Sequence, residues 1–186
     1  ASRSQLEHPK GARRKTKLEK EMQVQMMRLV AEGMDVAEIY SPPRIAERAR
    51  DWGLKGGWSL DLTTKDSDGR PWDFSKREMR RRAVAKINRD KPLVMIGSPM
   101  CTAFSKLQHL NFSKMTPDRV KEVIEHGMRH LEFCMHLYRI QVESGLYFLH
   151  EHPAEATSWD TEVVKRVLSL PGVRGVNGSM CAFGMV

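Results

Sequence analysis

The stretch KPLVMIGSPMCTAFS (residues 91–105) constrains the fold more than any other. Residues 93–97 form an unbroken apolar run, which is typical of a strand buried on both faces of a parallel sheet. The strand ends at Ser98-Pro99, because proline cannot donate a hydrogen bond to a neighbouring strand. Cys101 follows directly, in the position where open α/β sheets bind their ligands. Cys101 is therefore a candidate functional residue, and a small buried apolar residue is its alternative role.

Strand and helix patterns alternate along the rest of the chain. Apolar runs predict further strands at residues 34–40, 58–62 and 146–149, a short strand or loop at 72–74, and a possible last strand at 173–176. Spacings of three and four predict helices at residues 15–32, 43–52, 75–88, 116–144 and 161–168, with Ser75 and Thr116 as caps, and a loop at 106–115. The connections are long enough for parallel crossovers. The predicted fold is therefore α/β and Rossmann-like, a mostly parallel sheet with helices on both faces.

A basic arm and an extra helix are expected before the sheet. Residues 1–14 combine proline, glycine and charge without periodicity, which is typical of a disordered segment. Residues 15–32 carry a single apolar stripe, which predicts an amphipathic helix. Its members are Leu18, Met22, Met26, Leu29 and Val30. Residues 15–186 are expected to form one domain, and the chain to be a fragment of a longer protein.

The net charge of +8 favours a polyanionic partner, nucleic acid first. The basic side chains that we expect to contact phosphates lie in the arm, in the helix at 75–88 and after the first strand: Arg13, Arg14, Lys15, Lys17, Arg77, Arg80, Arg81 and Arg44. Ser105 is a further candidate contact. The alternative is that the arm is only a solvated tail.

Apolar runs and cysteines bear on where the protein works. No apolar run approaches the roughly 20 residues that cross a bilayer, so no membrane partner is expected. No signal peptide is recognisable, and the three cysteines are too widely spaced for a disulfide framework. We therefore expect an intracellular protein, nuclear or cytoplasmic.

Several chemically active side chains follow the predicted strands. The carboxyl ends of parallel strands meet at one edge of a sheet, so these side chains are expected to lie near one another. They are Glu38, Asp61, Asp73, Cys101, Glu151 and His152.

The segment Pro99-Met100-Cys101-Thr102-Ala103-Phe104-Ser105 resembles the Pro–x–Cys–x–x–Phe–Ser signature of cytosine-C5 DNA methyltransferases. This resemblance implies that Cys101 is a nucleophile and that Glu151 contacts the target base. It also implies S-adenosylmethionine as cofactor, held by Asp61 and Asp73, with Glu38 and Pro99 as further candidate contacts. Such chemistry needs a thiolate that adds to C6 of cytosine and an acid that stabilises the resulting charge.

An inactive relative is the alternative function. Where the resembled family has a glycine-rich turn after its first strand, this chain has Tyr40-Ser41-Pro42-Pro43-Arg44. Two prolines there remove backbone donors. The domain is then a nucleic-acid-binding or assembly module without catalysis.

A second resemblance covers nearly the whole chain from residue 34 onward. The stretches EIYSPPRI, KPLVMIGSPMCTAFSKLQ and YFLHEHPAEATSW resemble a domain of retrotransposon-like polyproteins, notably in microalgae. It implies a mobile-element or viral context, with other parts of a polyprotein as possible partners.

Three other constellations are open. His126, His130 and Cys134 have helical spacing that suits zinc, although a buried Cys134 flanked by histidines is favoured and no metal is expected. Cys101 could pair with His150 or His152 in a hydrolytic site. Trp52, Trp58, Trp72 and Trp159 could stack on bases, although tryptophans are more common in cores.

Overall fold

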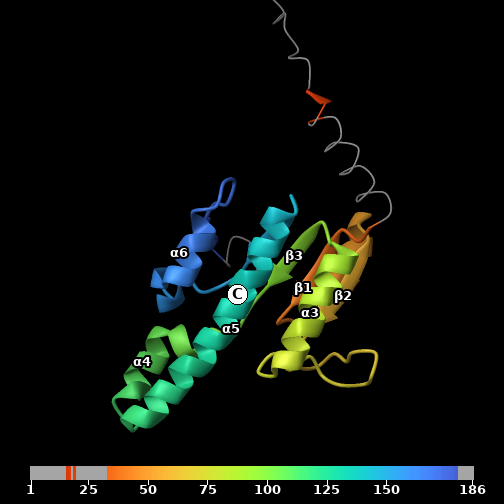
Figure 1. Cartoon of the computed structure of the whole chain (residues 1–186). Coiled ribbons are helices and arrows are strands. Elements are labelled where there is room, and N and C mark those ends of the chain that lie inside the picture. Colours follow the sequence, from red (N-terminus) through yellow and green to blue (C-terminus); the bar gives the residue numbers. More distant parts are fainter. Residues whose placement is uncertain (1–15, 18, 20–32, 180–186) are drawn as a thin grey trace, which may run out of the picture.

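Four parallel strands form the centre of the protein, as seen in a computed structural model that describes residues 16, 17, 19 and 33–179 (Figure 1). They are β1 (Val36–Ile39), β2 (Gly56–Leu60), β3 (Val94–Gly97) and β4 (Tyr147–His150), in the order β2-β1-β3-β4. The register pairs Ile39 with Gly97 and Gly97 with His150. Three strands therefore end level with one another, and the predicted Rossmann-like α/β fold is confirmed.

Helices cover both faces of the sheet. One face is covered by α3 (Arg77–Asp90) and α5 (Pro117–Glu143), which contact each other (Figure 1). On the opposite face, α2 (Ile45–Arg48) packs against β1 and β2, and the 3₁₀ turn Ala49–Trp52 contacts α2. The chain also forms α4 (Lys106–Phe112), α6 (Glu162–Leu168) and 3₁₀ turns at Thr102–Phe104 and Thr157–Asp160. No helix in the described ranges is long and apolar enough to cross a membrane.

The contact between α5 and the sheet fixes the core. A Cβ atom at Gly97 would collide with the hydroxyl of Tyr138 and crowd the sulfur of Cys134. The glycine therefore lets α5 approach β3 closely, and the Tyr138 hydroxyl donates to the carbonyl of Gly97 at 3.0 Å. Ile39, Met95 and Tyr138 are all fully buried in this layer.

Most predicted elements are observed near their expected positions. The strands predicted at 34–40, 58–62, 93–97 and 146–149 correspond to β1, β2, β3 and β4, and the predicted helix at 116–144 is α5. Thr116 caps α5, since its hydroxyl accepts the N–H of Arg119 and Pro117 follows at the first helical position. The basic arm at 1–14 lies outside the described residues, as does most of the helix predicted at 15–32.

Three local predictions are wrong. Residues 106–112 form α4 and not a loop, because Ser105 caps them by accepting the N–H of Gln108. Residues 173–176 form no strand. Ser75 does not cap α3: its hydroxyl donates to Asp73 at 2.6 Å, and the helix begins after Lys76. The 72–74 segment, for which a strand or a loop was possible, is a loop.

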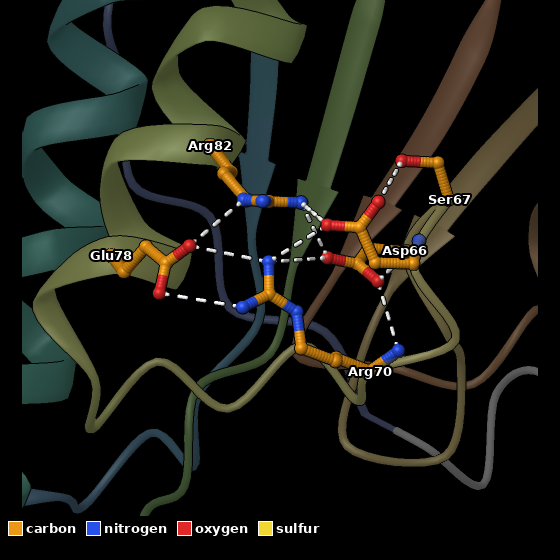
Figure 2. Close-up of polar contacts among 6 residues, drawn as sticks. Asp66, Ser67, Arg70, Glu78 and Arg82 are labelled. Atoms are coloured by element: carbon orange, nitrogen blue, oxygen red, sulfur yellow. Dashed lines mark hydrogen bonds and ion pairs between the residues drawn. The ribbon is translucent and has the colours of Figure 1, made fainter.

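The loop between β2 and α3 is held in place by an ion cluster (Figure 2). The Asp66 side chain, only 2% exposed, contacts the guanidinium groups of Arg70 at 3.4 Å and Arg82 at 2.8 Å. Asp68 and Glu78 contact the same two arginines. Burial would raise the pKa of Asp66. The backbone N–H groups of Arg70 and Asp68 and the two guanidinium groups instead hold that pKa below its ordinary value of 3.8.

We expect the Asp66 cluster to make folding acid-sensitive. Because the folded-state pKa is depressed, the cluster stabilises the fold above the ordinary aspartate pKa and loses this contribution as pH falls through the folded-state value. Asp66→Asn should therefore flatten the loss of stability below pH 4, measured by urea unfolding at a series of pH values. Asp51→Asn, which removes an exposed partner of Arg48, is the control. Equal pH dependence in wild type and Asp66→Asn would contradict this role.

Candidate functional site

The carboxyl edge of the sheet is the candidate functional site. The chain leaves β1 toward β2 and leaves β3 toward β4, so the connections diverge between β1 and β3. Ligands of open α/β sheets bind at such a switch point. Tyr40 and Ser41 follow β1, the Cys101 loop follows β3, and Glu151 follows β4, with its N–H bonded to the carbonyl of Gly97. The structure thus brings the ends of these three strands together, as the sequence predicts.

Cys101 is half-buried at the start of a 3₁₀ turn. Its carbonyl accepts the N–H of Phe104, which closes the turn. Cys134 is different: it is fully buried on α5, and burial raises the pKa of its thiol to about 12. The two thiols therefore differ in access, and only Cys101 is placed to meet a ligand.

His152 ties the Cys101 loop to the following segment. Its Nε2–H donates to the carbonyl of Pro99 at 3.2 Å, and its Nδ1 lies 2.6 Å from the Ser158 hydroxyl, which donates to it. Burial lowers the pKa of His152. Because both ring nitrogens are engaged, His152 acts as a structural link between the Cys101 loop and the turn at residues 157–160.

His150 has one engaged and one free ring nitrogen. Its Nδ1 lies 3.1 Å from the Tyr138 hydroxyl, whose own proton goes to Gly97, so Nδ1 carries a proton and donates. Its Nε2 is buried and has no hydrogen-bond partner among the described residues. Burial, and secondarily His152, lower the pKa of His150 to about 4, so the ring is neutral near pH 7.

Glu38 caps a helix inside the protein. Its side chain is 1% exposed and faces the start of α2, where one oxygen accepts the N–H groups of Arg44 at 3.0 Å and Ala46 at 2.8 Å. The other oxygen accepts the Ser41 hydroxyl at 3.1 Å. A protein carboxylate thus occupies the backbone donors that follow β1.

The other predicted cofactor residues also have internal partners. Asp61 accepts the N–H and hydroxyl of Thr63. Asp73 accepts the hydroxyl and N–H of Ser75, and that hydroxyl is the main cause that lowers the pKa of Asp73. The carbonyl of Pro99 is taken by His152. Glu38, Asp73 and the Pro99 carbonyl are thus engaged within the protein, which disfavours S-adenosylmethionine at these groups, whereas both contacts of Asp61 with Thr63 involve only its Oδ1.

Sequence reasoning missed a polar chain that starts from Tyr40. Its hydroxyl lies 3.0 Å from Nδ1 of His130, and Nε2 of His130 lies 3.3 Å from Nε2 of the exposed His126. Burial first, and then the neighbouring His126, Arg129 and Arg80, lower the pKa of His130 to about 4. The i, i+4 histidine spacing was visible in the sequence, but nothing in it joined the pair to Tyr40.

The basic residues predicted to bind nucleic acid differ in their surroundings. Arg77 and Arg81 are exposed on α3 and form no ion pair within the described residues. Arg80 donates to the carbonyls of Phe74 and Ser75. Arg44 is exposed beside the end of β1, and Ser105 caps α4. Lys17 lies in the short described stretch before residue 33, whereas Arg13, Arg14 and Lys15 lie outside the described residues.

The four tryptophans lie apart from one another, and the described residues form no metal site. Trp52 is exposed after α2, Trp72 is buried, Trp58 donates to Asp90, and Trp159 packs on His150. They do not form one stacking surface. The described residues contain no group of three or more His, Cys, Asp or Glu side chains suited to a metal ion.

An open groove of about 540 Å³ lies elsewhere, between α4 and the start of α5. Phe112, Met115, Val120 and Ile124 give it apolar walls, and Lys121 and Glu125 stand at its margin. None of the predicted site residues lines it, so the groove is separate from the chemistry expected at the sheet edge.

Removal of the internal cap should destabilise the fold. We expect Glu38→Ala to lower the free energy of unfolding by about 2 kcal/mol, because it leaves buried N–H groups unpaired at the start of α2. Urea unfolding at neutral pH measures this loss. Glu47→Ala, which removes an exposed carboxylate from the same helix, should change stability by less than about 0.5 kcal/mol. Equal effects of the two substitutions would show that Glu38 is not a cap.

Comparison with protein-family models, with curated proteins and with solved structures finds no match. The fold is thus shown by the structure itself, as an α/β domain with a four-stranded parallel sheet.

Proposed function

We propose that this domain binds nucleic acid through the phosphate backbone, across the α3 and α5 side of the carboxyl edge, and that this binding needs no S-adenosylmethionine. The observation that carries the proposal is a set of arginines without carboxylate partners. Arg77 and Arg81 on α3 and Arg129 on α5 are exposed and form no ion pair with any described residue. Phosphates are the ligands that such side chains favour.

Three exposed arginines elsewhere on the surface are paired with carboxylates. Arg48 pairs with Asp51, Arg119 with Glu122 and Arg139 with Glu143. Arg77 and Arg81 lie one turn apart on α3, and Arg80 and Arg129 both act on His130, so positive charge is grouped on this side of the protein. Such a local concentration favours a polyanion over a single small anion.

Basic side chains also lie near the polar chain of Tyr40 and His130. Burial is the main cause that lowers the pKa of His130, and His126, Arg129 and Arg80 act in the same direction against the opposite effect of Asp73. Two arginines therefore lie close enough to act on this ring. Arg77 lies one turn before Arg80 on α3, so the exposed arginines extend this basic group outward. The switch point of the sheet thus has the electrostatic character of a phosphate-binding surface.

The geometry after β1 favours the non-catalytic alternative. Glu38 occupies the backbone donors that would otherwise face a cofactor, and Tyr40 stands in a left-handed conformation (φ 59°) where glycine would leave space. Nucleic acid binding needs none of these groups, whereas a bound cofactor would.

Salt dependence tests this proposal. Binding of a short fluorescein-labelled single-stranded oligonucleotide should weaken steeply with salt, measured by fluorescence anisotropy. The triple variant Arg77→Ala, Arg81→Ala, Arg129→Ala should reduce the log–log slope by about 2, since each phosphate contact on a single strand contributes about 0.7. Sequence preference should not change, because phosphate contacts carry no base information.

A charge-matched triple variant serves as the control. Arg48→Ala, Arg119→Ala, Arg139→Ala removes the same number of charges from arginines that already pair with carboxylates. Its slope should stay close to that of the wild type. An equal decrease of the slope in both triple variants would show that only net charge matters and not the position of the arginines. Absence of binding at low salt would refute the proposed function.

Cytosine methylation is the second candidate function. Cys101 favours it, because this half-buried thiol follows β3 while Glu151 follows the adjacent strand β4. In this function Cys101 would add to the cytosine ring and Glu151 would contact the base. The cofactor that the reaction requires is disfavoured, because the residues predicted to hold it form hydrogen bonds within the protein: Glu38, Asp61, Asp73 and Pro99.

Thiol alkylation and calorimetry examine this second function. Iodoacetamide at neutral pH should modify Cys101 before Cys134, because the latter is buried and its pKa is raised. Peptide mass spectrometry measures the order. Micromolar binding of S-adenosylmethionine by calorimetry, with Cys101 reactive, would favour the enzyme. Absence of binding, or a Cys101 that reacts only after denaturation, would leave the nucleic-acid-binding module.

A further inference from the structure

The face of β3 and β4 that is turned away from α5, called the back face below, is more exposed than the rest of the sheet. Phe148 stacks on Tyr138 of α5 and His150 bonds to the same side chain, so both point toward α5. Because side chains alternate along a strand, Tyr147 and Leu149 point to the opposite face. Their exposed fractions are 59% and 51%. A large aromatic and an aliphatic side chain therefore stand in the open on a strand of the central sheet.

Exposure on this back face increases from β1 to β4. Val36, on β1, is 7% exposed and pairs with Val94, which is half-buried and pairs with Tyr147. The next row repeats this order: Glu38 is buried, Ile96 is half-buried and Leu149 is exposed. Helix α2 contacts β1 and β2 and therefore shields their side chains on this face, whereas the side chains of β3 and β4 are shielded less. Parallel sheets are normally covered on both faces, so this surface is a candidate docking site.

The segment before β1 has the properties of that partner. Thr16 and Glu19 bond reciprocally: the N–H of Thr16 donates to Glu19 at 2.7 Å, and the N–H of Glu19 donates to the Thr16 hydroxyl at 3.2 Å. This arrangement is a capping box, the start signal of a helix. The sequence that follows carries the apolar stripe from Leu18 to Val30, which is rich in methionine. Methionine adapts its shape to irregular apolar surfaces.

The connection of this segment to the sheet places it beside the back face. The carbonyl of Met34 accepts the N–H of Leu93, so the chain enters β1 next to the start of β3. Strands lie about 4.8 Å apart, so β4 is about 10 Å from β1. Residues 16–32 would extend about 25 Å as a helix. A short link at residues 33–35 can therefore return such a helix across β3 and β4.

We propose that the apolar back face of Val94, Ile96, Tyr147 and Leu149 is the docking surface for residues 16–32 of the same chain. The stripe of Leu18, Met22, Met26, Leu29 and Val30 packs against it and completes the second helical layer. This docking fixes the position from which the basic arm, with Arg13 and Arg14, extends. It is independent of the function proposed above.

Thiol labelling of the full chain tests the docking. Leu149→Cys places a thiol on the back face, and Leu62→Cys places one on a similarly exposed residue after β2, which serves as the control. Each is labelled with iodoacetamide in the otherwise wild-type chain and in a stripe variant, Met26→Ser with Leu29→Ser. Peptide mass spectrometry separates the introduced thiols from the native ones.

The docked segment should protect position 149. We expect labelling there to be at least about tenfold faster in the stripe variant than in the parent, while labelling at position 62 is unchanged. Cys134, buried on α5, reports folding, since it reacts only if the core opens. If Cys134 reacts in the stripe variant, Leu29→Ala replaces the double substitution.

Two outcomes would overturn the proposal. Equal labelling at position 149 in both backgrounds would show that the stripe does not cover the back face. Labelling at position 149 could also be slow in both backgrounds and become faster when the protein is diluted. That result would show that a second copy of the chain covers this face instead.

Discussion

The contact between Gly97 and Tyr138 is the constraint on which the rest of the structure depends. The missing side chain at Gly97 lets α5 lie directly on β3, and the Tyr138 hydroxyl then bonds to the Gly97 carbonyl and to His150 at the end of β4. One buried hydroxyl thus joins two strands and the longest helix. Its position fixes where β3 and β4 end, and so where the loops of Cys101 and Glu151 begin.

The proposal of binding without catalysis rests on the groups at the carboxyl edge and not on the fold. Parallel strands bring Cys101, Glu151 and the end of β1 to one edge, which is the common feature of proteins with many different activities. The chemistry depends on which groups at that edge are free. Glu38, His152 and Asp73 are engaged with neighbouring residues. Arg77 and Arg81 of α3 and Arg129 of α5, by contrast, form no ion pair with a described residue. This contrast is the reason why we propose a surface that binds phosphates.

Sequence patterns predicted the sheet well because each strand is a short apolar run between residues that stop a strand, as at Ser98-Pro99. The cap at Thr116 has a local signature and was also predictable. The seven-residue α4 was missed because so short a helix carries little periodic signal. The partners of Glu38 and Tyr40 could not be predicted, since Glu38 bonds to residues of a turn whose shape the sequence does not specify, and Tyr40 meets His130 from 90 positions away.

Helix α5 lies in two environments. From Gly127 onward one side of it is buried against the sheet, whereas residues 117–126 have no buried side chain and extend with α4 beyond the sheet (Figure 1). No residue of α4 is buried either. These segments therefore gain little from the core, and we expect them to open at a free energy below that of global unfolding. Backbone amides on one continuous helix will consequently exchange with solvent in two separate classes, with the boundary near Gly127.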